Sequence, residues 1–314
     1  MNASNLAPTV AVLGEALIDF KATGALAFQG FPGGSPFNVA VAVARLGQPV
    51  TFLGQVSGDM LGSHLRAYLA ANRVQTEFLL ESRAPTTVAF VDERDGNAHF
   101  QFMATGAADT LYDPRPRPAL PSSVKFIQFG SISLLNEPTA TTIAEIVNAH
   151  RNGCVVMFDP NCRPALTLDR ELYLSRLFNT WLPLAHIVKV SDQDLAWLQP
   201  DVPHPIVADD WLARGADAVI VTRGERGASL HRAGHAPLSV PAESIDIVDT
   251  VGAGDSFTAA CIVRLLELQQ NTAQALRTTI TEAHWLDVLQ FATAVAALNC
   301  MRAGANAPQR SEVG

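Results

Sequence analysis

A stretch near the C-terminal end, Asp249 to Phe257, places two glycines around an alanine and follows them at once with an aspartate. Glycine lets a backbone turn tightly and approach a ligand, because it carries no Cβ. From Ser256 to Leu268, apolar residues recur at steps of three and four, which predicts an amphipathic helix. The free N–H groups at the start of such a helix, with the positive end of its dipole, favour an anion, most often phosphate.

Asp255 ends the glycine-rich turn, at the mouth of the predicted anion site, where a carboxylate would repel a phosphate. A carboxylate held there can accept the proton of an attacking hydroxyl group, which is general-base chemistry. The competing interpretation is structural, because aspartate is also a good N-cap for a helix. The pattern Gly-x-Gly-Asp, residues 252–255, alone leaves both interpretations open.

A second group of candidate ligands lies near the N-terminal end. The apolar run from Thr9 to Leu13 predicts a buried parallel strand. Glu15 and Asp19 follow this run, where residues of open α/β sheets usually face a ligand.

A glycine pair precedes the first predicted helix. Ser35 is a good N-cap and Pro36 suits the first helical position. Gly33 and Gly34 let the backbone approach a ligand at this helix start, and Asn38 can point its amide into the same space. The alternative is a plain glycine-rich connection followed by a solvated asparagine.

Elements that could position these residues alternate along the rest of the chain. Strand-like runs at 124–129, 155–158, 187–190 and 219–222 alternate with helical patterns near 138–151 and 170–182, which predicts a doubly wound parallel sheet. Two further runs, 86–92 and 98–103, flank an Asp95-Gly96 turn and predict a hairpin. With 16–21 and 25–31, this hairpin could form a small separate sheet.

Two loops after predicted strands carry polar residues. Arg163 ends the segment Asp-Pro-Asn-Cys-Arg and is a fork-shaped donor for phosphate or sugar oxygens; the alternative is a local turn with a solvated arginine. Thr222, Gly224 and Gly227 lie in a glycine turn, which alone is weak support for any function because such turns are common between strands.

Composition excludes several classes of protein. The 314 residues are 48% hydrophobic and 17% charged, and their net charge of −8 argues against non-specific binding to nucleic acid. No apolar run is long enough to span a membrane, and the first 20 residues do not form a signal peptide. Four scattered cysteines predict reduced thiols and a cytoplasmic location. No Gly-Lys dipeptide of a P-loop and no dinucleotide-binding glycine motif after the first strand is present.

The segment Asp-Thr-Val-Gly-Ala-Gly-Asp, residues 249–255, resembles the C-terminal signature of the ribokinase-like (phosphofructokinase B) carbohydrate kinases at every fixed position. Gly-Gly-Ser-Pro-Phe-Asn, residues 33–38, resembles the family's N-terminal signature. The resemblance covers nearly the whole chain. It implies a single α/β domain, residues 1–314, with a ribokinase-like doubly wound mainly parallel sheet flanked by helices, and a small β-sheet lid inserted from about 16–32 and 86–104.

The resemblance also implies a role for individual residues. The general base is Asp255, and the amides of Gly252, Ala253 and Gly254 form the anion hole. The sugar-binding positions are Asp19, Gly33, Gly34, Asn38 and Arg163, and the nucleotide-binding ones are Thr222, Gly224, Gly227 and Gly254. Members often show Asn-x-x-Glu tied to Mg²⁺; here Ser191 and Asp194 stand in those places, so the expected Mg²⁺ ligand is Asp194, on a shorter arm. The expected K⁺ ligand is Asp249.

The implied activity is an ATP-dependent sugar kinase that uses Mg²⁺ and K⁺. Gly14-Glu15, Asp19-Phe20, residues 159–163 and residues 189–192 look most like bacterial fructokinases, which phosphorylate D-fructose to fructose 6-phosphate. Three alternatives stay open: a 2-keto-3-deoxygluconate kinase, a ribokinase-type sugar or nucleoside kinase, and a non-catalytic sugar-sensing protein. The expected partners are a small sugar, ATP and a second copy bound through the lid, with no nucleic acid and no membrane.

Overall fold

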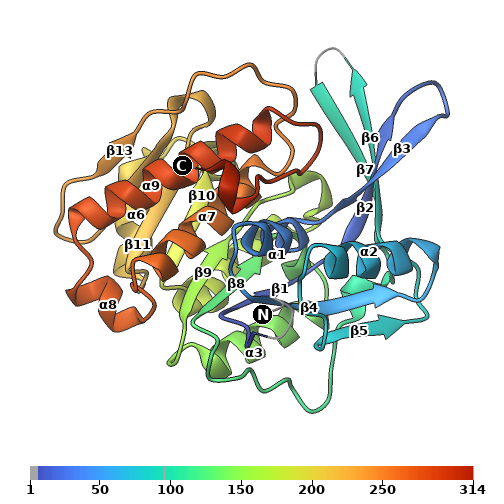
Figure 1. Ribbon diagram of the computed structural model, residues 1–314, viewed down its shortest axis with the longest axis horizontal. Coiled ribbons are helices and arrows are strands. Elements are labelled where there is room, and N and C mark those ends of the chain that lie inside the picture. The colour runs from blue at the N-terminus through green and yellow to red at the C-terminus, as the bar shows by residue number, and fades with distance from the viewer. Residues whose placement is uncertain (1–5, 95–96, 314) are drawn as a thin grey trace.

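A nine-stranded sheet forms the centre of the protein (Figure 1). The computed structural model describes residues 6–94 and 97–313. In spatial order the strands are β13 (Leu238–Val240), β12 (Ala228–His231), β11 (Ala218–Thr222), β10 (Ile187–Ser191), β9 (Val155–Asp159), β8 (Phe126–Gly130), β1 (Val10–Leu13), β4 (Val50–Ser57) and β5 (Leu79–Ser82). Only the β11–β12 and β12–β13 pairs are antiparallel, so the predicted mainly parallel, doubly wound sheet is confirmed.

Helices cover both faces of this sheet and create two hydrophobic cores. One face carries α1 (Ser35–Arg45), α2 (Met60–Ala71), α7 (Ala253–Glu267), α8 (Ala273–Thr278) and α9 (Glu282–Cys300), and the other α3 (Thr139–His150), α4 (Arg170–Arg176), α5 (Asp192–Leu198) and α6 (His204–Ala213). In β1, Val10 and Val12 point into the first core, whereas Ala11 and Leu13 point into the second. This alternation explains why the strand is apolar throughout.

A smaller four-stranded sheet projects from the body of the molecule (Figure 1). Its order is β3 (Phe28–Gly33), β2 (Leu17–Ala22), β6 (Val88–Arg94) and β7 (Asn97–Met103). The predicted separate sheet is therefore present, while the expected Asp95-Gly96 turn lies outside the described residues. The strand β2 leads directly from the end of β1 into this sheet, so residues 14–16 connect the two sheets.

Several predicted boundaries differ from the structure. The helix predicted from Ser256 begins at Ala253, so Asp255 lies inside its first turn. The predicted N-cap role of Ser35 is wrong, because Gly34 is the N-cap of α1 and Ser35 is its first residue. The helix expected over 170–182 is α-helical only to Arg176 and continues as a π-turn, η5 (Leu177–Trp181), and a 3₁₀ turn, η6 (Leu182–Leu184).

All four cysteines are free thiols, three of them buried. Within residues 6–94 and 97–313, no helix has the length and apolar character that crossing a bilayer requires.

Candidate active site

Candidate site residues gather at the carboxyl ends of the parallel strands. Glu15 follows β1, Asp159 ends β9, Ser191 ends β10 and Thr222 ends β11. The strand β1 is also where the chain order reverses, because β4 and β5 lie on one side of it and β8 to β11 on the other. Open α/β sheets bind their ligands at such a switch point, outside the carboxyl ends of the strands.

Asp255 is held by two side chains of α1. Ser35 Oγ donates a hydrogen bond of 2.7 Å to Oδ1, and Asn38 Nδ2 donates one of 2.8 Å to Oδ2. The N-cap of α7 is Gly252, so Asp255 is the third residue of the helix and not its cap. Its carboxylate therefore faces α1, not the N–H groups of its own helix, and the plain N-cap interpretation does not describe it.

The surroundings of Asp255 make it a stronger base than an exposed aspartate. Its side chain is buried, and burial raises its pKa above the ordinary value. The hydrogen bonds from Ser35 and Asn38, and the positive charges of Lys189 and Arg163, oppose this rise in pKa. A carboxylate with a raised pKa and two fixed donors has a defined orientation and an increased affinity for a proton.

Backbone N–H groups at the start of α7 are open. Within the part of the chain that the structure describes, the amides of Gly252, Gly254 and Asp255 donate no hydrogen bond, whereas Ala253 N donates to Thr250 O (3.2 Å). Gly252 has φ 76°, and a Cβ there would lie 2.6 Å from the Cβ of Ala305. The turn is thus closed on its outer side by the segment that follows α9, and its amides can bind an anion.

Asn299 ties this turn to the C-terminal part of the chain. Its side chain is fully buried; its Nδ2 donates to Val251 O (2.8 Å), and its Oδ1 accepts from Ser256 Oγ (3.2 Å) and Asn306 N (2.9 Å). The amide group of one residue therefore fixes the turn, the first turn of α7 and the C-terminal loop together. We did not identify Asn299 from the sequence, because an asparagine within an apolar helix carries no motif.

Glu15 is buried under the start of α1. Its Oε1 accepts from Ser35 N (3.1 Å), and its Oε2 accepts from both the N–H and the hydroxyl of Ser133. Burial raises its pKa, and these hydrogen bonds oppose the rise. Gly34 has φ 103°, and a Cβ there would lie 2.7 Å from Glu15 O, which explains the glycine. Glu15 thus positions the α1 start that holds Asp255.

Asp19 lies on β2, close to the backbone of the neighbouring strand. A Cβ at position 33 would lie 2.1 Å from Asp19 Oδ2, so Gly33 gives this carboxylate its space. Burial raises the pKa of Asp19 to about 6, Arg163 lowers it, and Asp255 and Glu15 raise it further. The predicted sugar-side residues are therefore brought together with Asp255 on one side of the site.

Arg163 makes its hydrogen bonds within its own loop. Its Nη1 donates to Asn161 Oδ1 (2.6 Å) and to Cys162 O (2.9 Å), and Asn161 has φ 39°. The guanidinium group still acts on Asp19 and Asp255 through its charge, since it lowers the pKa of both. The guanidinium group of Arg163, which we predicted as a donor to phosphate or sugar oxygens, thus lies at the site, with Nη1 already bound to its own loop.

The predicted nucleotide loop follows β11, two strands beyond β9 in the sheet. Thr222 ends the strand, and Gly224 has φ 54° with no atom within 4 Å of an added Cβ. Gly227 has φ 79°, and a Cβ there would lie 2.0 Å from Val240 O. Gly227 is therefore explained by packing against β13, while Gly224 faces open space.

The two predicted metal ligands are both bound to the chain. Asp194 Oδ1 accepts from Cys162 N (2.9 Å), and Oδ2 accepts from the N–H (3.2 Å) and hydroxyl (2.6 Å) of Ser191. Protein donors therefore fill Oδ2 of Asp194, whereas Oδ1 accepts a single hydrogen bond and keeps one lone pair for a cation. Asp249 accepts from Val251 N and Gly304 N, at 3.0 Å each, and lies 3.7 Å from the ammonium group of Lys21.

Lys189 is a site residue that the sequence pattern did not single out as functional. It lies on β10 and its Nζ donates to Asp159 Oδ2 (2.9 Å). A Cβ at Gly254 would lie 2.9 Å from the same Nζ, so the ammonium group is directly beside the start of α7. A lysine in an otherwise apolar strand run could have indicated a buried partner, since Lys is almost never fully buried unpaired.

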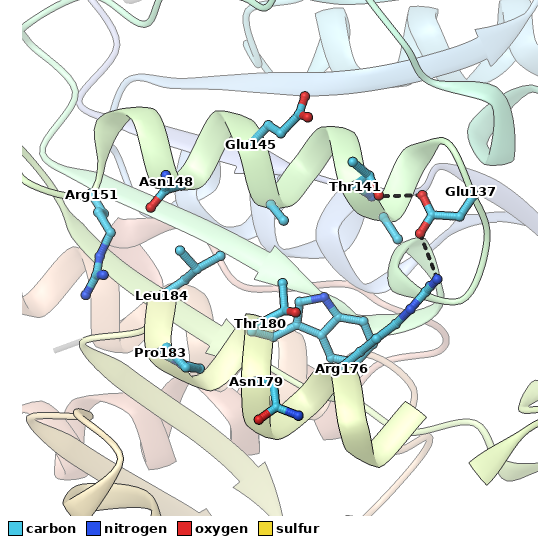
Figure 2. A pocket seen from close by; sticks show the side chains of 13 residues that line it. Glu137, Thr141, Glu145, Asn148, Arg151, Arg176, Asn179, Thr180, Pro183 and Leu184 are labelled. Atoms are coloured by element: carbon cyan, nitrogen blue, oxygen red, sulfur yellow. Dashed lines mark hydrogen bonds and ion pairs between the residues drawn. The ribbon is translucent and has the colours of Figure 1, made fainter. Parts of the chain in front are cut away.

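A cavity of about 480 Å³ lies elsewhere, between α3 and the η5–η6 segment (Figure 2). Its charged lining is largely neutralised, because Arg176 pairs with Glu137 (3.0 Å) and Glu145 pairs with Arg117 (2.7 Å). None of the carboxylates or glycines described above lines it. The candidate chemistry is therefore at the strand ends and not in this cavity.

Known proteins are similar to this chain in sequence and in fold. The profile of the pfkB family carbohydrate kinases matches residues 7–312. A fructokinase of Rhizobium leguminosarum bv. trifolii is 34% identical over 256 residues, which cover 80% of this chain and 78% of that protein. The solved structure of the fructokinase of Xylella fastidiosa with bound ATP has a TM-score of 0.87 at 31% identity, covering 96% of this chain and 94% of that one. A double mutant of the fructokinase of Vibrio cholerae O395, in a form with fructose, ADP and potassium ion bound, has a TM-score of 0.83 at 25% identity and covers 95% and 94%.

Proposed function

Because the chain belongs to the pfkB family of carbohydrate kinases, we propose that it is an ATP-dependent fructokinase that phosphorylates the 6-hydroxyl of D-fructose. The family resemblance of residues 249–255 and 33–38 is thereby confirmed. Similarity to fructokinases over most of the chain supports the substrate. The observation that carries the mechanism is the carboxylate of Asp255, fixed by Ser35 and Asn38 beside the open amides of α7.

Asp255 acts as the general base in this proposal. It takes the proton of the attacking hydroxyl, while the open N–H groups of Gly252 and Gly254 stabilise the charge that builds on the transferring phosphoryl group; the N–H of Ala253 is already bound to Thr250 O. The transition state of phosphoryl transfer is largely dissociative, so the proton is needed late and positioning contributes most of the catalysis. Ser35 and Asn38 supply that positioning, because each fixes one oxygen of the carboxylate.

The sugar lies between the two sheets in this proposal. Asp19, Asn38 and Arg163 would hold its hydroxyl groups, and Gly33 and Gly34 let it approach the backbone. ATP would bind with its phosphates at the 252–254 turn and its nucleoside along the Thr222 to Gly227 loop, where Gly224 leaves open space. The four-stranded sheet would then close as a lid and exclude water.

Two cations are part of the proposal. Mg²⁺ would neutralise phosphate charge and would be held chiefly by phosphate oxygens and water, as this ion commonly is, with Asp194 contributing Oδ1 directly or through water. K⁺ would bind at Asp249 and support the anion-binding turn; this carboxylate already attracts the ammonium group of Lys21, and a fructokinase of Vibrio cholerae O395 has been solved with potassium ion bound. A bound cation there would stabilise the strained turn.

We further propose a cytoplasmic homodimer that pairs through the lid. Four free thiols suit a reducing compartment. On the lid, Leu26 is 90% exposed and Met103 is 60% exposed, which gives a second copy an apolar surface to cover. Sedimentation of the wild type and of Leu26→Asp tests the pairing, since the proposal requires a smaller species in the variant.

A coupled ADP-release assay at fixed ATP and Mg²⁺, with fructose, 2-keto-3-deoxygluconate, ribose and nucleosides as acceptors, tests the activity. Fructose should give the highest kcat/KM, with phosphate found at position 6. A higher kcat/KM on another acceptor would replace fructose as the substrate. Sugar binding without ADP release on any acceptor would identify a non-catalytic sensor.

A further inference from the structure

Lys189 is the one lysine or arginine, among the residues that the structure describes, whose side chain is buried. Its partner Asp159 is equally buried, and Nζ and Oδ2 are 2.9 Å apart. Burial alone would lower the pKa of Lys189, but the charges of Asp159, Asp194 and Asp255 raise it above its ordinary value, so the lysine is a cation. This cation lies within a group of buried carboxylates.

The pair is attached to the helix that carries the general base. Lys189 Nζ lies 2.9 Å from the place that a Cβ of Gly254 would take, and Thr258 Oγ1 of α7 donates to Asp159 Oδ2 (3.4 Å). Gly254 is therefore required for two reasons: its amide is open toward the anion site, and its missing side chain gives the ammonium group its space.

Stability alone does not explain such a pair. Removing two charges from water costs several kcal/mol per ion, and apolar residues of similar volume often replace a buried pair without loss of stability. Here the surroundings are compatible with an apolar side chain, since Cys261 of α7, which lies close enough to be affected by the charge of Lys189, is itself fully buried. A cation at this position therefore calls for a role in the chemistry of the site.

The charges that face Asp255 come from four other elements. The loop after β9 contributes Arg163 and β10 contributes Lys189, and both lower the pKa of Asp255. Asp159 of β9 and Asp19 of β2 are the carboxylates that interact with it. Ser35 and Asn38 of α1 are neutral donors. Of the two cations, Arg163 is part of the loop that meets the ligands, whereas Lys189 is fixed inside the protein.

We propose that Lys189 is a positioning residue for phosphoryl transfer: its ammonium group, held by Asp159, adds positive charge beneath the anion-binding turn and favours the ionised form of Asp255. This inference rests on the proposed base role of Asp255. Without the ammonium group, Asp255 would be protonated at a higher pH, and activity would be lost earlier as the pH falls. Replacing Asp159 by a neutral residue removes a negative charge near Asp255, so Asp255 would be protonated at a lower pH than in the wild type.

The test compares Lys189→Met with Asp159→Asn by measuring kcat at saturating fructose and ATP between pH 5.5 and 9. In Lys189→Met, kcat should fall at least about tenfold at pH 7, with the loss at least about threefold larger at pH 6 than at pH 8. In Asp159→Asn, the ratio of variant to wild-type kcat should be higher at pH 6 than at pH 8. Lys125→Met, which removes a half-buried lysine that donates to Ser122 O, is the control and should keep the wild-type profile.

If the pair of Lys189 and Asp159 is purely structural, both variants will change the pH dependence of kcat in the same direction, or neither will change it. Either result overturns the proposal. The variant Asp159→Asn keeps an oxygen that can accept a hydrogen bond from Lys189, so the test can rely on this variant alone if Lys189→Met does not fold. In that case, a dependence of kcat on pH below 7 that equals that of the wild type also overturns the proposal. Failure of the proposed base role is seen separately, as activity retained by Asp255→Asn.

Discussion

Replacing Asp255 by asparagine should abolish phosphoryl transfer and leave both ligands bound. Asparagine is nearly isosteric, and its oxygen can still accept the 2.7 Å hydrogen bond from Ser35. Its NH₂ group would face Asn38 Nδ2, and Asn38 can restore this contact by rotating its amide so that its oxygen accepts. At most one hydrogen bond is lost, which is worth about 1 kcal/mol, and the desolvation cost of a buried charge is removed as well.

The expected loss in rate follows from the missing proton acceptor. Removing a general base costs on the order of 10² to 10⁴ in rate, so kcat should fall at least about a hundredfold, or about 2.7 kcal/mol in activation free energy. The dissociation constants of fructose and of a non-hydrolysable ATP analogue should change only by a few fold, with ATP bound more tightly because a negative charge is gone.

Coupled ADP release measures kcat, isothermal titration measures the two dissociation constants, and thermal unfolding checks the fold. Asp109→Asn is a matched control, because Asp109 is also a buried carboxylate that accepts from a hydroxyl, that of Thr87, which precedes β6, rather than one of α1. Its kcat should stay within a few fold of wild type. If Asp255→Asn keeps more than about a tenth of wild-type kcat, Asp255 is not the base and its role is to hold α1 against α7.

Three further outcomes are expected. The pKa of Asp19 is raised to about 6, and its ionised carboxylate accepts hydrogen bonds from hydroxyl groups better than the protonated form, so the KM for fructose should rise as pH falls from 7.5 to 5.5. The variant Asp19→Asn should have a higher KM that does not depend on pH. A KM that stays constant with pH in the wild type contradicts this prediction. Activity should be higher in K⁺ than in tetramethylammonium at equal ionic strength, and Asp249→Asn should lose this response; equal rates in wild type would count against a K⁺ site. Deleting residues 93–98 and joining the strands by a tight turn should raise the KM for sugar and the ratio of ATP hydrolysis to transfer; if both stay unchanged, the hairpin tip does not close the site.

Local patterns were sufficient to predict the architecture. Strands buried on both faces are continuous apolar runs, and helices of this fold have one apolar stripe, so both can be identified within a dozen residues. The glycine turn before α7 was equally predictable, because Gly252 takes a left-handed backbone and the helix begins directly after it. Boundaries were less accurate, since a helix can begin in the glycine turn itself, as α7 does at Ala253.

Contacts between distant segments could not be predicted in this way. Ser35 looks like an N-cap because its hydroxyl is the right group next to a proline, yet that hydroxyl donates to Asp255, 220 residues away. Gly34 takes the cap position with φ 103° because Glu15 O leaves no space for a Cβ. Lys189 and Asn299 act through partners on other elements as well, and only the folded chain brings those partners together.

The departure at Ser191 and Asp194 from the common Asn-x-x-Glu has a structural consequence. The shorter serine and aspartate form a reciprocal cap at the start of α5, and the second oxygen of the carboxylate holds Cys162 N, in the loop that carries Arg163. A longer glutamate could extend past this loop toward a metal ion, whereas the carboxylate of this aspartate already accepts three hydrogen bonds from Cys162 and Ser191. In the proposed mechanism, Mg²⁺ would then depend mainly on the phosphates for its ligands. In this protein, the charge of phosphoryl transfer would accordingly be stabilised mostly by fixed groups, namely the amides of the 252–254 turn and the cations Arg163 and Lys189, which need no reorganisation when the reaction occurs.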